Sequence, residues 1–254
     1  MLNVKKITEE LNNLGISAPK ILLYELTDST NERAREYARE KTDNRSPVVF
    51  IADGQTAGRG RRGRSFVSNS GAGIYISILT YPEAVGADAT VATSRAAVCL
   101  ARAIESLCDC DVRLKWVNDL YLGGKKLAGI LTEGEVAQDG KITYQVVGMG
   151  INVYKNAISD EISDIATSLE GEGISPPDRS ILAARIIGEV LSYSGDCYEE
   201  YRARSLVIGR RVCVIKANES YEAEVLDINP DFSLKIATEK GIESLFTGEV
   251  SLKI

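Results

Sequence analysis

Apolar and polar residues alternate along this chain with both helical and strand periodicity, which predicts mixed α and β structure. Four helices are expected where apolar residues recur at helical spacing or a cap precedes them: residues 3–14, 30–41, 88–107 and 178–204. Strands are expected where apolar residues cluster or alternate with polar ones: residues 21–26, 47–52, 74–79, 111–117, 126–135 and 141–153. Ser29 with Glu32 predicts a capping box, and Asp178 predicts a helix start. Gly123-Gly124 predicts a hairpin turn, and residues 154–177 a loop with a short helix.

The pattern changes at Val207, where short alternating runs are separated by turn residues such as Asn229-Pro230-Asp231. Four strands are expected in this part: residues 212–214, 221–225, 234–236 and 250–254. We therefore predict two domains, residues 1–206 and a small β barrel at residues 207–254.

The composition of the chain excludes or disfavours several classes of protein and of catalytic site. The chain has 254 residues, 44% hydrophobic and 26% charged, close to globular averages, so a wholly disordered chain is excluded. Its net charge of −6 disfavours a protein that holds DNA chiefly by neutralising phosphates. The absence of histidine excludes a His general base, a Ser-His or Cys-His nucleophile and a His-ligated metal.

The cysteines and the apolar runs indicate the compartment. The five cysteines are scattered, without the second pair that a zinc knuckle needs, so we expect reduced thiols and no protein-held metal. Neither a signal-peptide core nor an apolar run long enough to span a bilayer is present. We therefore expect a soluble cytoplasmic protein without membrane contact.

The densest chemical signal is residues 55–64, QTAGRGRRGR, in which four arginines are separated by glycines. Glycine lets backbone N–H groups approach an anion, and arginine matches phosphate or carboxylate oxygens. The P-loop pattern is absent, since no lysine follows the glycines. A solvated loop that binds nucleic acid without specificity is the simpler alternative.

Two further signals interrupt apolar strands. Lys115 and Asp119 bracket KWVND, just before KKLAGIL at 125–131, and charges in a buried strand are often functional. Alternatively, they form an ion pair at a strand end. The glycines of GMGIN at 148–152 indicate either a ligand against backbone or a simple β-bulge.

Together these motifs resemble those of the biotin–protein ligase family. The matching stretches, in the family's order, are DSTN at 28–31, QTAGRGRRGR at 55–64, KWVND at 115–119, KLAGIL at 126–131 and GMGIN at 148–152. The resemblance begins near residue 20 and reaches the C-terminus. It implies an α+β fold: a mixed sheet flanked by helices, like that of class II aminoacyl-tRNA synthetases, with a small SH3-like β barrel.

The resemblance also implies a two-step reaction. The carboxylate of biotin attacks the α-phosphorus of ATP, which is bound with Mg²⁺, and a lysine of a carrier domain then attacks biotinyl-5′-AMP. The acceptor implied is the biotin carboxyl carrier domain of a carboxylase or decarboxylase. No tightly bound prosthetic group is expected, and two copies of the chain can associate as a homodimer.

Roles are carried over by residue. The biotin-binding residues implied are Ser29, Thr30, Asn31, Gln55, Gly58, Arg59, Gly60, Arg61, Lys126, Gly129 and Gly148. The ATP-binding residues implied are Arg61, Arg64, Phe66, Asn118, Lys126 and Asn152. The catalytic residues implied are Lys126, Arg59, Arg61 and Asp119, with Asp119 expected to orient or deprotonate the incoming lysine.

The chain departs from the family at Val117, where proline is usual, and at Phe66, where tryptophan is common. Neither change removes a charge. About twenty residues precede the first strand, too few for the winged helix of relatives that also repress transcription, so we expect no DNA binding.

Three other functions fit parts of the sequence less well. A lipoate–protein ligase shares the fold and the adenylate strategy, but its motif includes a histidine, which this chain lacks. A nucleic-acid-binding regulator would show affinity with a steep salt dependence. A catalytically silent biotin-binding module is disfavoured by Lys126 and the complete arginine loop.

Overall fold

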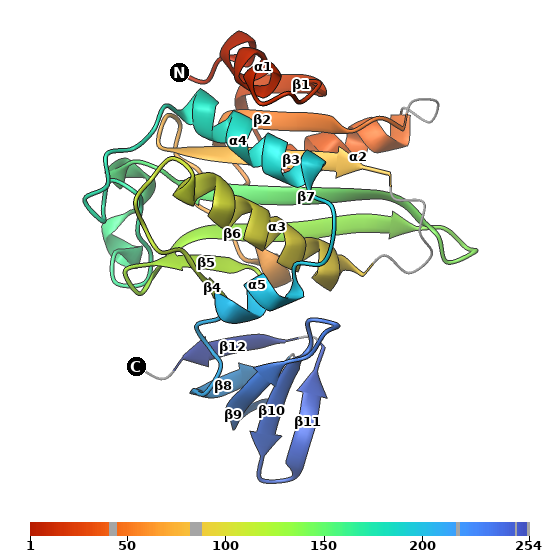
Figure 1. Ribbon diagram of the computed structural model, residues 1–254, viewed down its shortest axis with the longest axis vertical. Helices are drawn as coiled ribbons and strands as arrows, with labels where there is room; N and C mark the ends of the chain where they lie inside the picture. The colour runs from red at the N-terminus through yellow and green to blue at the C-terminus, as the bar shows by residue number, and fades with distance from the viewer. Residues whose placement is uncertain (41–44, 82–87, 217–218, 247, 253–254) are drawn as a thin grey trace.

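The computed structural model describes residues 1–254 except 41–44, 82–87, 217–218, 247 and 253–254, and it contains two sheets (Figure 1). The larger has the spatial order β1 (Lys20–Thr27), β2 (Val48–Gln55), β3 (Gly73–Thr80), β7 (Ile142–Asn152), β6 (Lys125–Val136), β5 (Asp119–Leu122) and β4 (Arg113–Lys115). β1 and β2 are parallel and the other neighbours antiparallel, so the sheet is mixed.

Helices cover both faces of this sheet because its inner strands are apolar on both sides. In β2, Val49 and Ile51 belong to one buried cluster, and Val48 and Phe50 to another. The first cluster is covered by α1 (Val4–Asn13), α3 (Ala89–Glu105) and α4 (Arg179–Ser192), and the second by α2 (Thr30–Glu40) (Figure 1). The predicted α+β class is confirmed.

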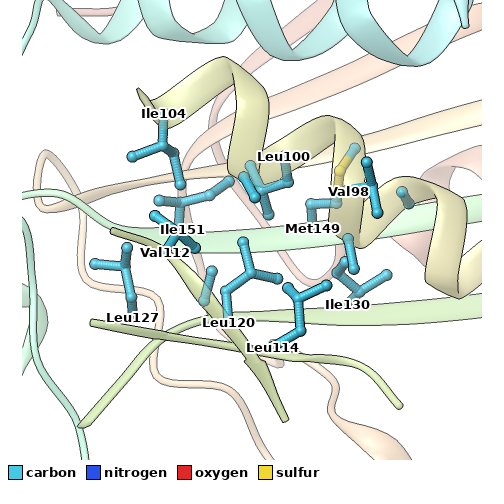
Figure 2. Close-up of a cluster of buried hydrophobic side chains, with 14 of the residues drawn as sticks. Val98, Leu100, Ile104, Val112, Leu114, Leu120, Leu127, Ile130, Met149 and Ile151 are labelled. Atoms are coloured by element: carbon cyan, nitrogen blue, oxygen red, sulfur yellow. The ribbon is translucent and has the colours of Figure 1, made fainter. Parts of the chain in front are cut away.

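Figure 2 shows how α3 packs on the centre of the sheet. Leu100 and Ile104 of α3 point toward Met149 and Ile151 of β7, and Ile130 of β6 belongs to the same buried cluster. Full burial of one such side chain contributes about 1.5–3 kcal/mol. Since side chains alternate along a strand, the glycines that flank Met149 face the opposite side, where the candidate site lies.

The predicted helix over 178–204 is wrong as one element. Asp178 caps α4 as expected, accepting hydrogen bonds from two backbone N–H groups, but α4 ends at Ser192 and α5 (Tyr198–Ala203) follows. Gly195 takes a positive φ of 110° between them. Asp196 then accepts a hydrogen bond from the N–H of Tyr198, the first residue of α5, whose N-cap is Cys197.

Two other local predictions are corrected. The Ser29 N–H donates to Asp28 at 2.6 Å, so Glu32 does not close the predicted capping box. The strand expected over 111–117 is only β4, and residues 116–118 turn the chain into β5. The predicted helix end at residue 41 and the strand end at 253–254 lie outside the described residues.

Residues 154–177 contain two short 3₁₀ helices, η2 (Lys155–Ala157) and η3 (Asp160–Ile162), where one short helix was expected. Among the described residues, no helix combines the length and the apolar character needed to cross a bilayer.

The smaller sheet is antiparallel. Its spatial order is β11 (Gly241–Leu245), β10 (Leu234–Thr238), β9 (Ser220–Ile228), β8 (Arg211–Ile215) and β12 (Glu249–Leu252). The sequence did not predict β11, because residues 241–244 are exposed at this edge and only Leu245 is buried. Trp116 Nε1 donates to the Phe232 carbonyl at 2.8 Å and joins this sheet to the larger one. The boundary at residue 206 stays a prediction.

Candidate functional site

A cavity of about 890 Å³, including space open to solvent, lies beside β6 and β7. It is bordered by the start of α2, the loop after β2 and the start of β12. The predicted site residues that line it are Ser29, Thr30, Asn31, Gln55, Arg59, Gly60, Arg61, Arg64, Phe66, Asn118, Asp119, Lys126, Gly129 and Gly148.

Two predicted site residues do not line this cavity. Gly58 lies under the loop, where a Cβ would overlap the Phe66 carbonyl oxygen. Asn152 is buried, and its amide donates to the Thr167 carbonyl at 3.1 Å. Both positions therefore support the surrounding chain, and their contacts with biotin or ATP stay predictions.

One end of the cavity consists of uncharged hydrogen-bonding groups. The Gln55 amide oxygen accepts from the Thr30 N–H at 2.8 Å, and the Gln55 amide nitrogen donates to Ser68 at 2.9 Å. The Ser77 hydroxyl lies 2.7 Å from the Thr30 hydroxyl and 2.6 Å from the Asn31 amide oxygen. This chain of bonds fixes the orientation of both amides before any ligand arrives.

Glycines in β6 and β7 leave space next to the strand backbone for other side chains. A Cβ on Gly148 would overlap the Asn31 amide oxygen. Gly129 and Gly150 are paired across β6 and β7, and the Phe66 ring lies over both. The strand glycines thus make room for functional side chains, which explains why they interrupt two otherwise apolar strands.

The arginine loop folds back on itself. The Gly60 N–H donates to the Arg64 carbonyl at 2.7 Å, and Arg59 and Ser65 form an antiparallel bridge. Between them lies η1 (Arg61–Gly63), where Arg62 and Gly63 take positive φ values of 56° and 74°. This turn directs the four guanidinium groups to different neighbours.

Arg59 and Arg61 have unlike surroundings. Arg59 contacts the carboxylates of Glu32 at 3.0 Å and Glu133 at 3.2 Å. Arg61 instead donates to the Asn118 amide oxygen at 3.1 Å and forms an ion pair with no carboxylate of the described residues. Burial lowers the pKa of the Arg61 guanidinium from its ordinary value, which still leaves it charged at neutral pH.

The other two arginines hold the smaller sheet. Arg62 donates to the Ile215 carbonyl at 2.8 Å, and Arg64 pairs with Glu249 of β12 at 2.7 Å. The small sheet thereby closes one side of the cavity.

Lys126 is a second cation of the cavity lining, in addition to Arg61. Its Nζ lies 2.8 Å from Asp119 Oδ1, which also accepts from the Asn118 amide at 3.0 Å. Lys115 lies nearby with its Nζ 3.4 Å from the Tyr121 hydroxyl. Burial lowers the pKa of Lys115 and raises the pKa of Tyr121 to about 12.

Several residues that line the cavity were not assigned from the sequence: Arg62, Ser65, Lys115, Trp116, Ile130, Leu131, Met149, Gly150, Gly248, Glu249 and Val250. Most lie inside the quoted motifs, so motif membership could have identified them. Gly248, Glu249 and Val250 come from the small sheet, and only the three-dimensional arrangement assigns them to the cavity.

The described residues contain no group of three or more His, Cys, Asp or Glu side chains arranged to hold a metal. The cavity lining does offer the carboxylates of Asp119 and Glu249. The arrangement suits a molecule with an uncharged polar head at the Asn31 end and an anionic group near Arg61 and Lys126.

Comparison with known proteins agrees with this chemistry. Residues 23–152, about half of the chain, match the model of the biotin/lipoate A/B protein ligase family. The chain is also similar to a solved structure, the biotin protein ligase from Aquifex aeolicus in complex with biotin and ATP, with a TM-score of 0.74 and 27% identity. The match covers 92% of this chain and 98% of that one.

Curated relatives cover most of the chain as well. It is 30% identical to the bifunctional ligase/repressor BirA of Bacillus subtilis, over 91% of this chain and 74% of that protein. It is 32% identical to the biotin–[acetyl-CoA-carboxylase] ligase of Mycobacterium tuberculosis, over 84% of this chain and 81% of that protein. The chain therefore belongs to the biotin/lipoate A/B protein ligase family.

Proposed function

We propose that this protein is a biotin–protein ligase, which activates biotin with ATP to biotinyl-5′-AMP and transfers biotin to a lysine of a biotin carboxyl carrier domain. The observation that carries the proposal is the division of the cavity. Preoriented amides and hydroxyls lie at one end, and Arg61 and Lys126 lie at the other. Biotin has the matching division, a neutral ureido ring and a carboxylate.

The same division distinguishes between the two substrates of the family. The dithiolane ring of lipoate has no N–H or C=O group, so it would form no hydrogen bond with the oriented polar groups of Thr30, Asn31 and Gln55. Each hydrogen bond that the ureido ring adds there contributes about 0.5–1.5 kcal/mol. Biotin is therefore the favoured substrate.

In the first step, a carboxylate oxygen of biotin attacks the α-phosphorus of ATP and pyrophosphate leaves. Two anions must approach each other, so fixed positive charge that faces both lowers the barrier. Lys126 and Arg61 supply that charge. Asp119 holds the Lys126 ammonium at 2.8 Å, inside the cavity.

Mg²⁺ is expected to enter with ATP. Mg²⁺ usually takes one or two carboxylates together with substrate phosphates, and Asp119 and Glu249 are the carboxylates of the cavity lining that would hold it. Both are paired in this structure, with Lys126 and Arg64, so the metal would share them with these cations. When bound, it would neutralise charge on the phosphates.

In the second step, the amine of the acceptor lysine attacks the acyl carbon of biotinyl-5′-AMP and AMP leaves. Asp119 lines the cavity and is half-buried, so it can accept a proton from the incoming ammonium or orient it. The acceptor we propose is the carrier domain of a carboxylase or decarboxylase.

The test is incubation of the purified protein with ATP, Mg²⁺ and radiolabelled biotin, with and without a carrier domain. We expect biotinyl-5′-AMP without the acceptor and label on one acceptor lysine with it. A parallel incubation with radiolabelled lipoate is the control. Transfer of lipoate in place of biotin, or no adenylate at all, would refute the proposal.

A further inference from the structure

Four charged side chains on three separate segments form a closed ring beside the cavity. Arg59 contacts Glu32 at 3.0 Å, Glu32 contacts Arg35 at 3.1 Å, Arg35 lies 3.8 Å from Glu133, and Glu133 contacts Arg59 at 3.2 Å. Positive and negative groups alternate, so the Arg–Glu ring is neutral. It joins the arginine loop to α2 and to β6.

The ring is more sheltered than ordinary surface ion pairs. The exposed fractions of the Glu133, Arg35 and Glu32 side chains are 20%, 26% and 29%, and that of Arg59 is 43%. Screening by salt is therefore weaker than at an open surface. Each carboxylate contacts two guanidinium groups, which makes the ring harder to open than an isolated pair.

Glu133 also contacts a residue that lines the uncharged end of the cavity. Its second carboxylate oxygen accepts from the Asn31 amide nitrogen at 2.9 Å. The same Asn31 nitrogen donates to the Leu131 carbonyl at 3.2 Å, so the amide oxygen faces Ser77. One carboxylate thus fixes both the Asn31 amide and the Arg59 guanidinium.

Arg59 is consequently a poor candidate for direct contact with an anion. Two carboxylates already neutralise its charge, and a ligand carboxylate would have to displace one of them. Arg61 and its partner Asn118 form no such pair in the described part of the chain. The two arginines of one motif therefore have different electrostatic states.

We infer that Arg59 and Glu133 are positioning residues: the Arg–Glu ring holds the arginine loop closed and orients Asn31, so ureido binding and loop closure are coupled. The inference rests on the proposed function, and it assigns Arg59 a role other than the direct anion contact that the sequence resemblance implied. The coupling arises because the residues share contacts. A ligand that binds Asn31 stabilises its hydrogen bond to Glu133, and Glu133 in turn forms the ion pair that holds Arg59.

The first test compares biotin with its alcohol, in which CH₂OH replaces the carboxylate, by calorimetric titration. Arg59→Gln is expected to weaken binding of both ligands by the same factor, about 10-fold, which is about 1.4 kcal/mol. Lys126→Ala is the contrast and should weaken biotin binding more than alcohol binding. If Arg59→Gln weakens biotin binding but leaves alcohol binding unchanged, Arg59 contacts the carboxylate and the inference is overturned.

The second test is a double-mutant cycle between Arg59→Gln and Glu133→Gln, read as the KM for biotin and the KM for ATP. If both residues act through the ring, the double variant should be about as impaired for biotin as either single variant, with the KM for ATP changed less than about 2-fold. Additive effects would contradict a shared ring. Glu135→Gln, on the same strand but paired only loosely with Arg39 at 3.9 Å, is the matched control and should change neither KM.

Thermal melting of each variant separates loss of fold from loss of coupling. If only Arg59→Gln has a low melting temperature, the ligand affinities of Glu133→Gln test the inference instead. Glu133→Gln breaks the ion pair with Arg59, but its new amide oxygen can still accept the hydrogen bond from Asn31. Failure of the wild-type protein to bind either ligand is a distinct outcome. It would refute the proposed function and, with it, the coupling.

Discussion

Replacing Lys126 by alanine tests the centre of the proposed chemistry. The Lys126 ammonium lies 2.8 Å from Asp119 Oδ1, and the exposed fractions of the two side chains are 32% and 19%. Removal leaves the Asp119 carboxylate in the cavity with the Asn118 amide as its described partner. The variant therefore makes the local charge more negative by one unit, where two further anions must meet.

The expected loss follows from electrostatics. Unit charges about 4 Å apart interact by about 4 kcal/mol at the effective dielectric of a partly exposed site. Loss of one preorganised group at such a centre typically costs about 2.7–4 kcal/mol in the transition state. Adenylation by Lys126→Ala should therefore slow by roughly 100- to 1,000-fold. The change in folding stability should stay below about 1 kcal/mol, because solvent screens a pair of this exposure.

The assay is biotin-dependent release of pyrophosphate, with thermal melting as the check on folding. Lys125→Ala is the matched control, because Lys125 precedes Lys126 on β6 and its Nζ donates to the Ser163 carbonyl outside the cavity lining. It should retain adenylation within about 2-fold. Near wild-type adenylation by Lys126→Ala, or an equal loss in Lys125→Ala, would refute the assignment.

Three further predictions concern other groups of the site. Asp119→Asn should slow transfer from preformed biotinyl-5′-AMP to the acceptor at least about 10-fold more than it slows adenylation, in single-turnover measurements; equal slowing would exclude a role for Asp119 in the second step. Gly148→Ala should raise the KM for biotin about 10-fold or more, because the new Cβ overlaps the Asn31 amide, whereas Gly140→Ala, at a φ of 81° in the turn after β6, should lower stability only. Burial lowers the pKa of Lys115 below its ordinary value of 10.5. Between these two pKa values the unfolded chain binds more protons than the folded protein, so the free energy of unfolding rises with pH across this window. Lys115→Met should raise the melting temperature at pH 7 and remove that alkaline rise; an unchanged pH profile would exclude Lys115 as its source.

The central strands and the cavity floor could be predicted from local patterns. Apolar runs identified β2, β3 and β7 to within a few residues, because these strands are buried on both faces. The strand predicted at 126–135 matches β6 as closely, although fewer of its residues are buried. Glycines within β7 predicted either a ligand against its backbone or a β-bulge; the pairing is regular there, so the bulge is wrong, and Asn31 occupies the space beside Gly148. The ligand contact stays a prediction. Both predictions depend only on neighbours in sequence and on the period of a strand.

The prediction of one long helix failed because a short turn interrupts a regular apolar pattern. The apolar stripe of α4 continues in register through Cys197 and Tyr201, which predicted one helix, yet Gly195 and Asp196 interrupt it. β11 was not predicted because its sequence has no apolar alternation. It is an edge strand, and residues 241–244 are all exposed.

The arginine loop shows why a count of charges in a motif overstates the charge that a site offers. Arg59 is neutralised by two carboxylates, Arg62 donates to a backbone carbonyl and Arg64 pairs with a glutamate of the small sheet. Three of the four guanidinium groups therefore hold the loop against α2, β6 and the small sheet, and Arg61 alone keeps an uncharged side-chain partner beside Lys126. No spacing rule joins Arg59 to Glu32 or Glu133, which are far from it in sequence. Most of the arginines therefore fold the loop, and Arg61 is the one left for the anion contact that we propose.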